Sequence, residues 1–65
     1  MPPKIRELKK RLRDAGFTQT TGKGSHSNWT HPSARLLVTI AGNDGADARK
    51  YQVKLVTSAI REAKP

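Results

Sequence analysis

Apolar residues near the start of the chain recur at the spacing of a helix that packs through one face. They stand three or four positions apart at Ile5, Leu8, Leu12 and Ala15. Pro2 and Pro3 precede this stretch, and proline is favoured at a helix start because its fixed φ suits the first turn. Gly16 follows as a natural stop. The pattern predicts a first helix between the prolines and Gly16.

The spacing then changes to that of strands. Residues 17–21 combine an aromatic side chain with three threonines and a glutamine, which suits a half-buried strand. Residues 22–24 contain two glycines and are predicted to form a turn. A second strand is expected over residues 25–31, a second turn at residues 32–33 and a third strand over residues 35–40. Loops this short favour an antiparallel meander.

Side chains alternate between the two faces of a strand, so residue parity separates the core face from the other face. One face of the third strand is the better core and carries Leu36, Val38 and Ile40. One face of the second strand carries Trp29 and His31, and the other carries His26, Asn28 and Thr30. We expect Phe17 and Trp29 to turn inward, with Trp29 in the core rather than stacked on a base, and His26 to be exposed.

A loop separates the third strand from a second helix. Glycine, asparagine and aspartate dominate residues 41–47, and Asp47 is a candidate helix cap. Apolar residues then return to helical spacing at Tyr51, Leu55, Val56, Ala59 and Ile60. The order is therefore α-β-β-β-α. We expect an α+β fold in which two helices cover one face of a three-stranded antiparallel sheet and leave its other face open to a ligand.

Size and composition narrow the class of protein. A chain of 65 residues is expected to form one domain, residues 1–65, because so short a chain cannot divide a core between two units. It has no cysteine, so neither a disulfide framework nor a thiolate metal site can reinforce it. The chain has neither an apolar stretch of membrane-spanning length nor the apolar core of a signal peptide. We therefore expect a cytoplasmic protein with no membrane partner.

The charge points to polyanions. Thirteen Lys and Arg face five Asp and Glu, for a formal net charge of +8, which favours nucleic acid, although an acidic protein or an anionic membrane surface would answer the same charge. Six of the cations fall on the first helix, outside its apolar stripe. Among them Lys9, Lys10 and Arg13 are predicted to contact RNA phosphates. Membrane association is less favoured, because the stripe has only three large apolar residues.

Candidate chemistry gathers between residues 24 and 32, which hold both histidines and the tryptophan. Histidine titrates near neutral pH, so it can take and return the proton that cleavage at a ribose 2′-hydroxyl requires. His26 is the candidate base, whereas parity places His31 on the opposite face, where we expect it to hydrogen-bond to the following turn. A metal site joining both histidines to Asp44 and Asp47 is disfavoured on the same ground, so no metal or cofactor is predicted.

Four short motifs, taken together in this order, resemble the HicA (YcfA-like) family of small mRNA interferases from toxin–antitoxin systems. They are Lys-Ile-Arg-Glu-Leu at 4–8, Asp-Ala-Gly-Phe at 14–17, Lys-Gly-Ser-His at 23–26 and Trp-Thr-His-Pro at 29–32. The resemblance covers nearly the whole chain. Many family members carry a second histidine or another bulky residue directly after the first, where this chain has Ser27.

The resemblance implies a fold similar to double-stranded-RNA-binding domains and a role as the toxin of a type II toxin–antitoxin system. It implies metal-independent cleavage of mRNA by a single catalytic histidine, which maps onto His26, and neutralisation by a cognate HicB-like antitoxin. Lys23 and Ser25 shortly precede His26 and are expected to bind RNA, with Lys23 stabilising charge on phosphoryl oxygens. We expect a monomer when antitoxin is absent. The alternative is a non-catalytic RNA-binding module of the same fold, and only bond cleavage separates the two.

Overall fold

Two helices and three strands build the part of the chain that the structure, a computed structural model, describes: residues 1–35 and 37–63. In chain order they are α1 (Ile5–Asp14), β1 (Thr18–Lys23), β2 (His26–Thr30), β3 (Val38–Ala41) and α2 (Lys50–Ala63). The predicted α-β-β-β-α order is confirmed. Leu36, predicted on the core face of the third strand, lies outside the described residues.

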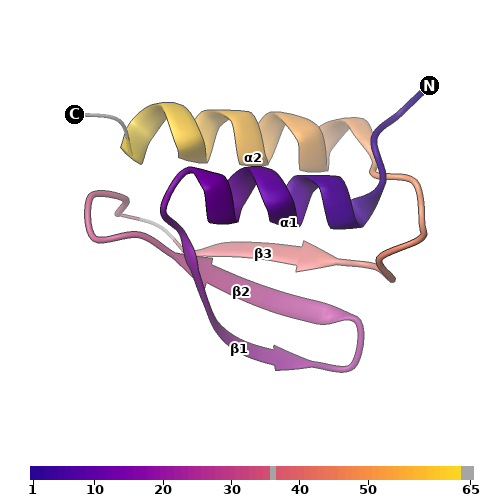
Figure 1. The fold of residues 1–65 in the computed structure, drawn as a ribbon, viewed down its shortest axis with the longest axis horizontal. Helices are drawn as coiled ribbons and strands as arrows, with labels where there is room; N and C mark the ends of the chain where they lie inside the picture. Colours follow the sequence, from indigo (N-terminus) through magenta and orange to yellow (C-terminus); the bar gives the residue numbers. More distant parts are fainter. Residues whose placement is uncertain (36, 64–65) are drawn as a thin grey trace.

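The strands form one antiparallel sheet in the order β1-β2-β3, so β2 is the central strand. Both helices lie on the same side of this sheet, and α1 runs beside α2 (Figure 1). The β1–β2 turn, the β3–α2 loop and the first turns of both helices gather at one end of the molecule (Figure 1). The architecture is the predicted α+β fold and is consistent with a double-stranded-RNA-binding-domain-like fold.

The core lies between the sheet and the two helices. Its largest fully buried side chains are Trp29, Ile5, Leu8, Leu12, Ile40, Val38 and Val56. Phe17 is also buried, at 4% exposure, although it precedes β1 rather than belonging to it. The apolar stripe of the first helix and the inward position of Trp29 are therefore confirmed. Burial of this kind is the main source of stability in a domain without cysteine.

The first turn begins two residues later than the sequence suggested and ends one residue later. β1 continues through Lys23, so the turn predicted at residues 22–24 is wrong, and the loop consists of Gly24 and Ser25 alone. Gly24 has φ +62°, and a two-residue hairpin loop with glycine first accommodates that conformation without steric cost. A register shift between Gln19 and Thr21 adds one residue to β1. That extra residue was not visible in the strand pattern.

The buried face of α2 also differs from the prediction. Tyr51 and Leu55 are 61% and 40% exposed, and Gln52 is buried instead. Val56 is buried as predicted, and Ala59 and Ile60 pack against the core. Gln52 is 3% exposed because both ends of its amide are satisfied. Its Nε2 donates to the Ala41 carbonyl (2.7 Å), and its Oε1 accepts from the Arg49 backbone N–H (2.8 Å). A polar residue therefore joins the start of α2 to the end of β3.

The predicted cap of the second helix is wrong as well. α2 begins at Lys50, which places Asp47 outside the helix. Asp47 instead forms an isolated β-bridge with Lys4, and its carboxylate accepts a hydrogen bond from the Lys4 ammonium. The residue therefore joins the β3–α2 loop to the segment before α1.

Candidate functional site

His26 occupies a fixed position at the start of the central strand. It pairs with Lys23 of β1 on one side and with Ala41 of β3 on the other. The Ser25 carbonyl, one residue earlier, accepts a hydrogen bond from the Gly42 backbone N–H (2.9 Å). The hairpin turn is thereby joined to the segment after β3. The backbone under His26 is held from both sides, so the imidazole projects from a rigid element.

The side chain of His26 faces away from the helices. Along β2 the burial alternates: Ser27 and Trp29 are buried, whereas His26 is exposed and Asn28 is partly exposed. Alternate residues of a strand project to opposite faces, so His26 and Asn28 share the open face of the sheet. The predicted exposure of His26 is confirmed.

A shallow hollow of about 520 Å³ surrounds the histidine, lined by Gly22, Lys23, His26 and Asn28. Lys23 and His26 are directly opposite each other, and such pairs project from the same face with Cβ atoms about 5 Å apart. The hollow therefore combines an imidazole that can exchange a proton, an ammonium group and a carboxamide.

Asn28 is the residue of this hollow that the sequence did not single out. Its Oδ1 accepts a hydrogen bond from the Thr39 hydroxyl on the neighbouring strand (2.7 Å). The two residues are also register partners of β2 and β3. Residue parity had already placed Asn28 on the same face as His26. The missing signal was the cross-strand partner, which depends on the register of β3.

Gly22 allows β1 to approach β2 closely behind the histidine. A Cβ on this residue would lie 2.9 Å from the His26 carbonyl oxygen and 3.0 Å from Nε2 of Gln19. The first of these is a backbone atom, which cannot rotate away. A side chain at Gly22 would therefore displace the backbone that presents His26.

Ser27 lies on the core face, opposite to the hollow. Its hydroxyl accepts a hydrogen bond from the Trp29 indole N–H (2.9 Å) and makes a long contact of 3.5 Å with the Ile40 carbonyl. The serine is 3% exposed. Ser27, where the chain departs from the HicA pattern, thus accepts the hydrogen bond of the buried indole and does not line the site of His26.

His31 is separate from the open face. Its ring lies against Phe17, with 5.1 Å between ring centroids, and its Nδ1 accepts a hydrogen bond from the Ser33 backbone N–H (2.9 Å). The predicted hydrogen bond to the following turn is confirmed. Gly16 packs close to the same ring, since a Cβ there would lie 3.1 Å from Nε2 of His31. The second histidine therefore supports the junction between α1 and β1.

The cations predicted to bind RNA fall into two groups. Lys23 is in the hollow and Ser25 is exposed in the adjoining turn. Lys9, Lys10 and Arg13 instead belong to α1, on the opposite side of the sheet from the His26 side chain. The structure therefore brings only the first group next to the histidine.

The three α1 cations also have partners of their own. Lys9 donates to the Asp44 carboxylate (2.6 Å), and Lys10 donates to Asp14 (2.7 Å). The guanidinium carbon of Arg13 lies 5.8 Å from the centroid of a Trp29 ring, within cation–π range. The Lys9 hydrogen bond and charge hold the pKa of the Asp44 carboxyl below its usual value of 3.8, with Arg13 and Arg6 contributing in the same direction.

Residues 1–35 and 37–63 contain no group of three or more His, Cys, Asp or Glu side chains placed to hold a metal ion. Over the same ranges, neither helix combines the length and the apolar character needed to span a membrane.

Comparison with known proteins identifies the family. The sequence model described as HicA toxin of bacterial toxin–antitoxin systems matches residues 5–64, which is nearly the whole chain. A search of curated proteins and a search of solved structures each gave no match. The match and the fold agree with the motifs around His26. The chain belongs to the HicA toxin family of bacterial toxin–antitoxin systems.

Proposed function

We propose that this protein is the toxin of a type II toxin–antitoxin system and cleaves mRNA without a metal ion, with His26 as the general base. The observation that carries the proposal is the placement of His26 in a HicA-family chain. It stands exposed on the open sheet face, opposite Lys23 and above a rigid two-residue turn. An extended RNA strand can reach this face because both described helices lie on the other side of the sheet.

The chemistry is transfer of a phosphoryl group to the neighbouring ribose oxygen. The neutral imidazole of His26 takes the proton from a 2′-hydroxyl, and the resulting oxygen attacks the adjacent phosphorus in line. The bond from phosphorus to the 5′-oxygen breaks, leaving a 2′,3′-cyclic phosphate on one product. The departing 5′-oxygen takes a proton from water, which reaches the open hollow, and His26 returns its proton to solvent.

Lys23 and Asn28 support the reacting phosphate. Negative charge builds on the phosphoryl oxygens during attack, and the Lys23 ammonium lies on the same face to stabilise it. The Asn28 carboxamide is held in place through its oxygen by Thr39, so it serves to orient the RNA strand. Ser25, exposed in the turn, is positioned for a sugar or phosphate contact.

The α1 cations have a secondary role in this proposal. On the helix side, Lys10 and Arg13 would bind phosphates of a longer RNA strand that extends beyond the hollow. Both side chains of the Lys10–Asp14 pair are exposed. Exposed ion pairs contribute only about 0–1 kcal/mol to stability, so a phosphate can replace the carboxylate of Asp14. Lys9 is less available, because its side chain is only 19% exposed and is bound to Asp44.

The partners proposed for the protein are mRNA and a cognate HicB-like antitoxin, with the protein monomeric in the antitoxin's absence and resident in the cytoplasm. The net charge of +8 favours both an anionic substrate and an acidic inhibitor. RNA binding should therefore weaken steeply as salt rises.

The proposal is tested by cleavage of a defined RNA in the presence of EDTA. Wild-type protein should cleave all-ribose RNA and should spare the same RNA with 2′-deoxyribose at the cleaved position. His26→Gln keeps a polar side chain of similar reach but cannot exchange a proton near neutral pH, so cleavage should fall about 10²- to 10⁴-fold while RNA binding persists. Undiminished cleavage by this variant would refute the role of His26. Binding without cleavage by the wild type would favour the alternative, a non-catalytic RNA-binding module.

A further inference from the structure

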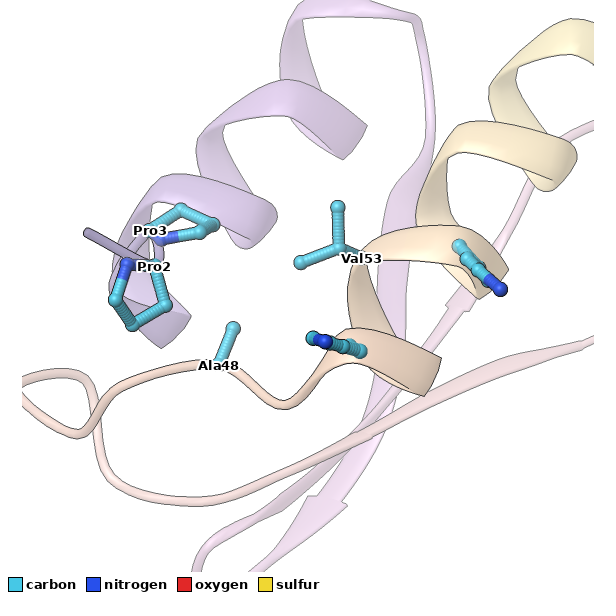
Figure 2. A pocket seen from close by; sticks show the side chains of 6 residues that line it. Pro2, Pro3, Ala48 and Val53 are labelled. Atoms are coloured by element: carbon cyan, nitrogen blue, oxygen red, sulfur yellow. The ribbon is translucent and has the colours of Figure 1, made fainter.

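A second hollow lies in the helix layer, apart from the open sheet face. It has a volume of about 570 Å³ and is lined by Pro2, Pro3, Ala48, Lys50, Val53 and Lys54. Figure 2 shows the two prolines on one side of this space, Val53 on the other, and Ala48 between them at the lower edge of the view. None of the lining residues comes from the sheet, so the hollow is distinct from the site of His26. We call it the proline groove.

The walls of the proline groove are joined by backbone hydrogen bonds. The Ala48 N–H donates to the Pro3 carbonyl (2.8 Å), and the Ile5 N–H donates to the Ala46 carbonyl (2.9 Å). The β-bridge between Lys4 and Asp47 lies between these two bonds. Proline also restricts its own backbone, so this wall loses little conformational freedom when a ligand binds. The groove is therefore a preformed concave surface.

The chemistry of the groove is apolar inside and cationic at the rim. Proline rings, a valine and an alanine methyl line the interior, while Lys50 and Lys54 stand one helical turn apart beside it. Within the described ranges, neither lysine forms an ion pair. An occupant that matches both features carries an apolar side chain flanked by carboxylates.

Other occupants match less well. Phosphates of RNA would satisfy the two lysines but would leave the apolar interior unfilled. None of the described residues that line the groove is aromatic, so a base would have no ring on which to stack. A second copy of this chain also carries 13 basic and only 5 acidic residues, so positive charges of the two copies would meet at the rim of the groove.

We propose that the proline groove binds an acidic segment of a partner protein, with one apolar side chain of that segment inserted between the prolines and Val53. Lys50 and Lys54 would pair with carboxylates on either side of the inserted residue. The inference does not depend on RNA cleavage, because the groove shares no lining residue with the hollow around His26. A partner bound here would leave the open sheet face uncovered.

The test is an NMR titration of the labelled protein with three probes. They are a short Glu- and Asp-rich peptide with one central leucine, the same peptide with serine in its place, and a single-stranded oligouridylate. The leucine peptide should shift the methyl signals of Ala48 and Val53. The serine peptide should bind at least about tenfold more weakly than the leucine peptide.

Charge-reversal variants complete the test. The double variant K50E/K54E should reduce the affinity for the leucine peptide by about tenfold or more, because two attractive rim charges become repulsive. The double variant R11E/R61E, which changes two exposed positions away from the groove by the same charge, should retain most of the affinity. All four substitutions are at exposed positions, and an unchanged backbone spectrum verifies folding in each variant.

Three results would overturn the inference. Equal affinity for the leucine and serine peptides would mean that nothing apolar enters the groove. Shifts of the Ala48 and Val53 methyls by the oligouridylate, with none from the peptides, would assign the surface to nucleic acid. An absence of methyl shifts with every probe would mean that the groove is not a binding surface.

Discussion

The two faces of β2 carry out different tasks within five residues. On the face toward the helices, Trp29 and Ser27 are buried, and the indole N–H is satisfied by the serine hydroxyl. On the open face, His26 is exposed opposite Lys23 of the hairpin, and Asn28 is partly exposed in the same hollow. In the proposed function, neighbouring positions in one strand thus divide stability from catalysis. Substitutions on the two faces should separate these properties.

The largest effect is expected on the core face. Trp29→Ala removes the largest fully buried side chain and should cost about 3–5 kcal/mol of unfolding free energy, enough to leave so small a domain largely unfolded. Tyr51→Ala is the matched control, because this ring is 61% exposed, and it should change stability by about 0.5 kcal/mol or less. Urea unfolding followed by circular dichroism measures both. Equal losses in the two variants would contradict the placement of the core.

A smaller effect is expected where the two faces share backbone. Gly22→Ala places a methyl group against the His26 carbonyl, so we expect a loss of about 1–3 kcal/mol together with slower RNA cleavage. Gly45→Ala is the control, since a Cβ at Gly45 has no heavy atom within 4 Å. Stability and cleavage are measured on both proteins. If the two alanine variants behave alike, close approach at Gly22 does not position the histidine.

The cross-strand bond on the open face should have a modest effect. Thr39→Val removes the hydroxyl that donates to Asn28, which should cost about 0.5–1.5 kcal/mol. Cleavage should also slow, because the carboxamide loses its orientation, whereas Thr39→Ser keeps the donor and should retain most of the rate. Comparison of cleavage rates and urea midpoints for the two variants provides the measurement. A valine variant with full activity would remove Asn28 from the site.

The smallest effect is expected from the ion pair between α1 and the β3–α2 loop. The pKa of Asp44 is lowered in the folded state, chiefly by Lys9. The Lys9–Asp44 pair therefore stabilises the protein at pH values above 3.8, the pKa of the unfolded state, and this stabilisation is lost as the pH falls through the lower folded pKa. Asp44→Asn should therefore be slightly less stable than wild type at neutral pH and equal to it at strongly acidic pH. Thermal unfolding across this range tests the sign. A difference that grows on acidification would contradict it.

The order of elements and much of the core could be predicted from the sequence, because each depends on local periodicity. The stripe of α1 and the two faces of β2 followed from spacing alone, and so did the exposure of His26. The motifs around that histidine also indicated the family.

Features that depend on tertiary contacts could not be predicted. Gln52 takes a core position because Ala41 and Arg49 satisfy its amide, and this turns Tyr51 and Leu55 outward. The register shift in β1, which adds one residue to that strand, also depends on the pairing with β2. The separation of the α1 cations from His26, by contrast, follows from the predicted layering, in which the helices cover the Trp29 face of the sheet and His26 lies on the other face.

The most direct test of the division between the two faces of β2 is a paired measurement on His26→Ala: the free energy of unfolding and the single-turnover rate of RNA cleavage in EDTA. Because His26 is exposed and proposed to act in catalysis, stability should change by about 0.5 kcal/mol or less while cleavage falls by about 10²-fold or more. A variant that keeps the wild-type cleavage rate, or one that loses cleavage only because it unfolds, would contradict the proposed role of this histidine.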